Sequence, residues 1–157
     1  MNIVRIDEDF QRWEELLALI LSSFAYMNDR IDPPSSALKL TPVTLADKAS
    51  SEIAHAAMEG GILCGCVFLR PEEGCLYVGK LAIAPDAQGR GIGRKLLAIA
   101  EQVARDRALP SLRLETRIEL VENHDVFMRW GFEKTAENAH PGFTRTTSIE
   151  MRKPVLA

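Results

Sequence analysis

A glycine-rich turn between an apolar segment and a helix contains the residue types that most clearly indicate chemistry. The turn reads Gln88-Gly89-Arg90-Gly91-Ile92-Gly93-Arg94 and follows the apolar run that starts at Leu76. The first N–H groups of a helix have no intrahelical acceptor and lie at the positive end of its dipole. Glycine lets a bulky anion approach these donors closely. The turn is therefore predicted to bind a phosphate or a pyrophosphate.

The spacing of the glycines excludes two common nucleotide motifs. A dinucleotide fingerprint starting at Gly89 would need a glycine where Arg94 stands, and a Walker loop would need Ser or Thr where Leu96 follows Lys95. What remains is Gln88-x-x-Gly91-x-Gly93 after Ala84-Pro85-Asp86. This pattern resembles the acyl-CoA-binding motif of the GNAT superfamily of N-acetyltransferases. The alternative is a glycine-rich turn that only reverses the chain.

The resemblance implies a site for acetyl-CoA as cosubstrate. By that resemblance, backbone N–H groups of the turn bind the pyrophosphate, main-chain groups of the preceding strand bind the pantetheine arm, and an N–H near Ile83 polarises the thioester carbonyl. The implied cofactor-binding residues are Leu81, Ala82, Ile83, Gln88, Gly89, Arg90, Gly91, Ile92, Gly93, Arg94, Asn123 and Phe127.

The sequence departs from the family pattern at Phe127, and the spacing from Asn123 to Phe127 is shorter than in the commonest version. Many members have a tyrosine four residues before the glycine of a Gly-Phe pair, where its hydroxyl protonates the CoA sulfur. Here the pair is Gly131-Phe132, and the earlier position is Phe127. Either the thiolate leaves without a protein acid, or another hydroxyl or imidazole supplies the proton. Asn123 lies in the family's asparagine region, where it can contact CoA or act as a helix N-cap.

Four residues are candidate catalytic bases: Glu115, Glu119, His124 and His140. Glu115 is ranked first because it ends a central strand, where the cleft is expected to open; alternatively, it pairs with Arg113 or Arg117. His140 lies in a late loop with Pro and Gly and has a side chain suited to proton relay. Alternatively, His140 and His124 are solvent-exposed surface residues without a catalytic role.

The loop after the first helix is the candidate acceptor-binding segment, since this loop overhangs the acceptor site in the family. Tyr26, Asp29, Arg30 and Asp32 are its candidate substrate-binding residues. The two aspartates suit an ammonium group, and the arginine suits a carboxylate. The alternative is a polar surface loop.

The hydrophobic periodicity predicts the elements that position these residues. A crossover helix makes the strands on either side of it parallel. Together with the resemblance, the pattern indicates an α/β (α+β) fold with a mixed, mostly antiparallel sheet, splayed between strands 4 and 5 and flanked by about four helices. The predicted elements are a strand at 1–6, a helix at 10–24 capped by Asp9, a helix at 43–49 capped by Thr41, strands at 51–59 and 62–69 joined by Gly60-Gly61, a strand at 75–83, a helix at 91–107, a strand at 111–116, a helix at 122–130, and strands at 132–137 and 144–152.

Composition limits the other possibilities. The 157 residues suit a single domain over 1–157, and a net charge of −3 argues against nucleic acid as the main partner. No apolar run is long enough for a bilayer and no signal peptide is recognisable, so no membrane partner and a cytoplasmic location are expected. The three cysteines are expected to be buried thiols rather than metal ligands. A homodimer is left open.

The predicted function is transfer of an acetyl group from acetyl-CoA to a primary amine of a small molecule, directly within a ternary complex. One alternative is a CoA-binding regulatory module without catalysis, which Phe127 favours. Another is acetylation of a protein N-terminus or a lysine, which needs an open acceptor groove.

Overall fold

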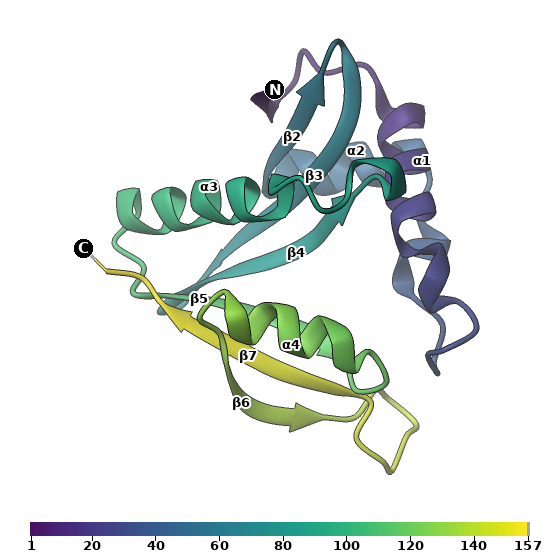
Figure 1. Ribbon diagram of the computed structural model, residues 1–157, viewed down its shortest axis with the longest axis vertical. Coiled ribbons are helices and arrows are strands. Elements are labelled where there is room, and N and C mark those ends of the chain that lie inside the picture. The colour runs from purple at the N-terminus through teal and green to yellow at the C-terminus, as the bar shows by residue number, and fades with distance from the viewer. Residues whose placement is uncertain (157) are drawn as a thin grey trace.

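A seven-stranded sheet forms the centre of the computed structural model, which describes residues 1–156 (Figure 1). Its spatial order is β1-β2-β3-β4-β5-β7-β6, and only β4 and β5 are parallel. The fold class predicted from the sequence is confirmed. The strands are β1 (Asn2–Ile6), β2 (Ile53–Glu59), β3 (Ile62–Glu72), β4 (Cys75–Ile83), β5 (Ser111–Arg117), β6 (Glu133–Asn138) and β7 (Ser148–Pro154).

Helices cover both faces of the sheet. On one face α1 and α2 pack against β2 and β3 through a core that includes Leu16, Leu45 and Phe68. On the other face α3 and α4 pack on a second core around Leu76 and Leu96. The helices are α1 (Trp13–Phe24), α2 (Pro42–Ser51), α3 (Ile92–Asp106) and α4 (Val121–Arg129), with short 3-10 turns η1 (Ala25–Met27), η2 (Ser36–Lys39) and η3 (Pro85–Ala87).

The parallel strands β4 and β5 are paired at one end only. Their register contains just two pairs, Leu76 with Leu112 and Tyr77 with Arg113. Figure 1 shows the two halves of the sheet meeting near the C-terminus and diverging away from it. The predicted splay between strands 4 and 5 is thus present, and each strand continues into it without its neighbour.

A bulge in β4 lies just inside the divergent part. Phe68 of β3 pairs with Gly79, whereas Cys66 pairs with Ala82, so β4 contains one residue more than β3 in this interval. Lys80 lies in the bulge and has a φ of +47°. Such a conformation is unusual for a residue with a side chain. The bulge redirects the side chains of the strand as it enters the gap.

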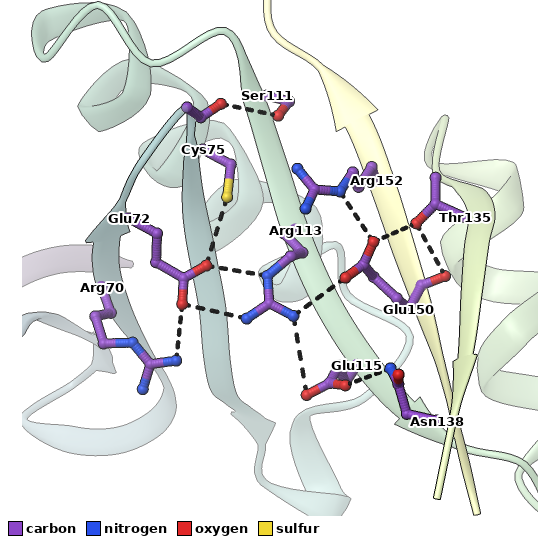
Figure 2. A network of polar contacts seen from close by, with 11 residues as sticks. Arg70, Glu72, Cys75, Ser111, Arg113, Glu115, Thr135, Asn138, Glu150 and Arg152 are labelled. Atoms are coloured by element: carbon purple, nitrogen blue, oxygen red, sulfur yellow. Dashed lines mark hydrogen bonds and ion pairs between the residues drawn. The ribbon is translucent and has the colours of Figure 1, made fainter. Parts of the chain in front are cut away.

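An ion-pair network fastens the closed end of the splay (Figure 2). Arg113 of β5 donates to both carboxylate oxygens of Glu72 of β3, at 3.0 and 3.2 Å, and to Glu150 of β7 at 3.4 Å. Hydrogen bonds from the Arg113 guanidinium, followed by those from Arg70, lower the pKa of Glu72 to about 2. The Tyr77 ring lies between the two guanidinium groups, 4.7 Å from Arg70 and 4.5 Å from Arg113.

The first helix begins later than its apolar stripe predicts. The α1 helix starts at Trp13, and the predicted cap, Asp9, does not cap it. The backbone N–H of Asp9 donates to Asp7 Oδ1 at 2.9 Å, and Phe10 N–H donates to the Asp7 carbonyl. Residues 7–10 therefore form a turn before the helix, in which Phe10 packs edge-on against Trp13.

Other boundaries also differ from the prediction. The strand predicted to end at residue 69 continues to Glu72, because Pro71 and Glu72 pair with Leu76 and Cys75 of β4. The last strand begins at Ser148 rather than at residue 144, because residues 140–147 form a loop closed by Thr147 N–H donating to the Asn138 carbonyl at 2.8 Å. The aperiodic stretch after α1 contains η2, whose start is capped by Ser35 Oγ.

The hairpin at Gly60-Gly61 and the three buried, unpaired cysteines agree with prediction. Within residues 1–156, no helix combines the length and apolar character needed to cross a membrane.

The predicted cap of α2 is present as a capping box. Thr44 N–H donates to Thr41 Oγ1 at 3.2 Å, and Thr41 N–H donates to Thr44 Oγ1 at 2.8 Å. Replacing Thr41 with Ala leaves the Thr44 donor without its acceptor, so we expect a loss of about 1 kcal/mol in the free energy of unfolding. Chemical denaturation measures this loss. Thr41→Ser is the control and should unfold as the wild type does; an equal loss in both variants would contradict a capping role.

Candidate active site

A cleft of about 1340 Å³ occupies the divergent part of the sheet. Residues of β4 line one wall and residues of β5 the opposite one, while the glycine turn, α4 and the loops after α1 and β6 complete the lining. The sheet opens where backbone pairing between β4 and β5 stops, so this lining includes strand edges whose backbone groups face no neighbouring strand.

The glycine turn lies at the start of α3 and fits an anion. Gly89 and Gly91 both have a φ of +80°, and no atom lies within 4 Å of the position of an added Cβ at either glycine. Gly91 is the N-cap residue of α3. Among residues 1–156, no protein group accepts a hydrogen bond from the backbone N–H groups of residues 88–94. We therefore expect these N–H donors, together with the positive end of the helix dipole, to bind an anion that is not part of the chain.

Two residues of the turn have other roles. Arg90 does not line the cleft, because its guanidinium pairs with Glu59 at the end of β2. Gly93 is buried, and an added Cβ there would lie 2.9 Å from the Trp130 ring. Gly93 thus lets α4 pack against the start of α3.

The strand before the turn presents Leu81 and Ile83 to the cleft, whereas Ala82 packs in the core on the α1 side. Ile83 N–H donates to Ser23 Oγ of α1 at 3.2 Å. Within the protein, therefore, this N–H already has an acceptor. Ala84 N–H bonds to the Cys64 carbonyl of β3, and by strand alternation the N–H of Leu81 faces the same side as that of Ile83.

Helix α4 contributes Asn123 and Phe127 to the lining. Phe127 packs edge-on against Trp130 and Phe132, with ring centroids 5.8 and 5.9 Å away. Asn123 is not the N-cap, which is Leu120. Instead, Asn123 Nδ2 donates to the Tyr26 hydroxyl at 2.8 Å and ties α4 to the segment after α1.

Of the four base candidates, Glu115 and His140 line the cleft, whereas Glu119 does not. Glu115 Oε1 accepts from Asn138 at 3.0 Å, and Arg113 lies 3.9 Å from its other oxygen. His140 is fixed by Thr147, whose Oγ1 accepts from the His140 backbone N–H at 2.8 Å and contacts Nδ1 of the ring. Burial, followed by the nearby Arg117 charge, lowers the pKa of His140 from its ordinary value.

His124 lies outside the lining, and its Nε2 contacts the Arg117 carbonyl at 2.8 Å. Among the acceptor candidates, Tyr26 lines the cleft. Asp29, Arg30 and Asp32 do not. Arg30 instead forms an ion pair with Glu122 of α4.

Four basic residues of the cleft lining were not predicted as site residues: Lys39, Lys80, Arg117 and Arg129. Lys80 is a charge inside the otherwise apolar strand 75–83, which was a readable signal. Arg117 was considered only as a partner of Glu115, and its place in the cleft depends on the splay.

Comparison with known proteins identifies the family. The model of the acetyltransferase (GNAT) family matches residues 13–132. The chain belongs to this family. No protein of curated function matches the sequence significantly.

Solved structures of family members resemble the whole chain. A Klebsiella pneumoniae protein assigned as an acyl-CoA N-acyltransferase is 28% identical, with a TM-score of 0.70 and coverage of 99% of this chain and 97% of the other. The PaiA N-acetyltransferase of Thermoplasma acidophilum, in complex with coenzyme A, has a TM-score of 0.80 at 16% identity, with coverage of 98% and 99%. A GNAT acetyltransferase of Staphylococcus aureus has a TM-score of 0.76 at 16% identity and 99% coverage of both chains.

The protein is therefore an acetyl-CoA-dependent acyltransferase. The open glycine cradle and the donors of residues 88–94 fit the pyrophosphate of this cosubstrate. Among residues 1–156, no three His, Cys, Asp or Glu side chains are grouped so that they could hold a metal ion.

Gly91→Glu tests the glycine cradle. The new carboxylate would lie beside the bound pyrophosphate, so we expect the Kd for CoA, measured by calorimetry, to rise about tenfold or more. Gly74→Glu is the matched control, because Gly74 has a similar φ of +77° and equally open space around an added Cβ, but lies in the distant β3–β4 turn. Unchanged CoA affinity in a folded Gly91→Glu protein would disprove this site.

Proposed function

We propose that the enzyme acetylates the primary amine of a small molecule, by direct transfer within a ternary complex. The observation that carries this proposal concerns residues 30–36, named the roof, of which residues 33–36 line the cleft. The roof is fastened to the β5 half of the sheet at several points, which limits the size of an acceptor.

The roof contacts come from three separate parts of the chain. Arg117 at the end of β5 donates to the carbonyls of Pro33, at 2.6 Å, and Pro34, at 3.1 Å. Asp32 N–H donates to the Glu119 carboxylate at 3.2 Å, and the Asp32 carbonyl accepts from Arg145 at 2.9 Å. A protein N-terminus or a lysine on a folded surface would require these contacts to open, whereas a small amine would not.

Direct transfer is supported by where the thiols lie. A cysteine that carried the acetyl group would need to reach the cleft as a thiolate. All three cysteines are buried and none of them lines the cleft. Burial raises the pKa of Cys66 to about 12. The amine itself is therefore the group that attacks the thioester.

In this proposal, Glu115 holds the incoming ammonium group and His140 accepts its proton. The lowered pKa keeps the imidazole neutral at pH 7, as a base must be. When Nδ1 donates to Thr147, Nε2 retains its lone pair. Since Phe127 has no hydroxyl, the thiolate leaves without an acid at that position, which is tolerable because thiols are far more acidic than alcohols.

An amine panel tests the proposed acceptor class. With acetyl-CoA present, we expect thiol release with small primary amines and little release with peptides that offer a free N-terminus or a lysine. A thiol-reactive dye follows the reaction, and mass spectrometry identifies the acetylated product. Turnover with peptides alone would overturn the small-molecule assignment.

The pH profile tests the role of His140. The wild-type kcat/KM should fall as the pH decreases through the lowered imidazole pKa, below its ordinary value of 6.5, because the imidazolium cannot accept a proton. His140→Gln should lower the plateau by about a hundredfold and remove this acidic limb. Measuring both proteins with the same amine cancels the titration of the acceptor. An unchanged acidic limb in the variant would assign the proton transfer elsewhere.

A further inference from the structure

The charges around the cleft are unbalanced. Both carboxylates of the lining have basic partners: Glu122 pairs with Arg30, and Glu115 lies 3.9 Å from Arg113. The chain as a whole has a net charge of −3, so this local excess of positive charge does not reflect composition. The basic residues of the lining are Lys39, Lys80, Arg94, Arg117 and Arg129.

Two of these cations stand on opposite walls of the gap. Lys80 comes from the β4 bulge and Arg117 from the end of β5. Both side chains reach the same part of the roof, since Lys80 Nζ donates to Ser36 Oγ at 3.0 Å and Arg117 donates to the carbonyls of Pro33 and Pro34. The segment 33–36 thus bridges the divergent strands, with Arg117 bonded to its start and Lys80 to its end.

Neither cation has an ionic partner in the part of the chain that the structure describes. No carboxylate of residues 1–156 lies within 4.0 Å of Lys80 or Arg117, although the cleft partly buries both. Burial lowers the pKa of Lys80, and the charges of Lys48 and Arg117 add to this shift, while the Glu52 carboxylate opposes it. Burial also lowers the pKa of Arg117, against the more distant Glu119 and Asp32. Partly buried charges without a partner are unfavourable unless an anion joins them.

The backbone at Lys80 gives a second, independent observation. Its φ of +47° is a conformation that glycine or asparagine adopts more readily than lysine, at a cost of about 1–2 kcal/mol for other residues. The bulge turns this one side chain into the cleft. A glycine at this position would adopt the positive φ without strain. The lysine side chain therefore has a role beyond the backbone conformation.

We propose that the acceptor amine carries an anionic group, a carboxylate or a phosphate, which binds between Lys80 and Arg117. This inference rests on the proposed small-molecule acceptor and narrows its class to acidic amines. The anion would form ion pairs with both cations. Glu115, two residues before Arg117 on the same face of β5, would bind the ammonium group. The cleft would thus recognise a molecule that has both charges.

Anchoring the roof does not by itself account for these cations. A hydroxyl group and two carbonyls can be held by neutral donors, without placing two positive charges next to each other. Lys80 as the catalytic base is a different role, and it predicts a different result. Loss of an anion contact raises the KM of acidic acceptors, whereas loss of a base lowers kcat for every acceptor.

Matched acceptor pairs test the proposal. Each pair differs by the acidic group: phenylalanine with phenethylamine, leucine with isopentylamine, and phosphoethanolamine with ethanolamine. With the wild type, we expect kcat/KM to favour the acidic member of at least one pair by about tenfold to a hundredfold, the usual range for a hydrogen bond to a charged group. The amino acid pairs and the phosphate pair show which anion is preferred. Equal rates within every pair, or preference for the neutral members, would overturn the proposal.

Variants of Lys80 identify the residue responsible. Lys80→Met should remove most of the preference through KM, and Lys80→Arg should retain part of it. Lys134→Met is the charge-matched control, because Lys134 pairs with Glu137 on β6 outside the cleft. An equal fall in kcat for both members of a pair would show that Lys80 acts otherwise and would overturn the proposal.

One measurement does not depend on a folded variant. Phenylpropanoate, which has the carboxylate but no amine, should inhibit the wild type competitively against a phenylalanine acceptor; if only the phosphate pair shows the preference, ethyl phosphate takes its place against phosphoethanolamine. Absence of inhibition would contradict the anion site. Absence of turnover with every amine would instead refute the proposed function.

Discussion

The site depends on one structural constraint, which is that β4 and β5 pair at only two positions. A continuous parallel pair would satisfy the facing edges of both strands and would leave no room between them. Here the pairing ends after Tyr77 and Arg113, and the ion pairs of Arg113 with Glu72 and Glu150 hold three strands together at that point. The bulge at Lys80 then leads β4 away from its neighbour. The ion pairs at the paired end of β4 and β5 thus fix the positions from which the two strands diverge.

The gap created in this way needs cover on both faces, and different parts of the chain supply it. On one face, Trp130, the residue that follows α4, lies against Gly93 at the start of α3. This contact connects the wall of the cleft to the anion-binding turn. On the other face, the segment 33–36 crosses from Lys80 to Arg117. The donor end of the cleft is therefore made of backbone groups on a helix start, whereas the acceptor end is made of side chains on strands and loops.

This division explains what the sequence could predict. The anion-binding turn is local, so its glycines and the helix after it could be recognised from spacing alone, and the splay followed from the family resemblance. The acceptor end is assembled from residues far apart in the chain, such as Lys80 with Ser36 and Arg117 with Pro33. No periodicity links such residues. The misplaced start of α1 has a similar cause, because Phe10 continues the apolar stripe but belongs to a turn.

The proposed anion site also bears on the chemistry of the amine. An acceptor must lose a proton before it attacks the thioester, and nearby positive charge favours the neutral form of an amine. Once the acidic group of the acceptor has joined Lys80 and Arg117, its negative charge offsets part of theirs. Glu115 can still attract the ammonium during binding. His140, which is kept neutral by burial and by the Arg117 charge, is then positioned to receive the proton. The same arginine thus serves the roof, the anion and the base, and a change at Arg117 would affect all three at once, which is why Lys80 is the more informative position.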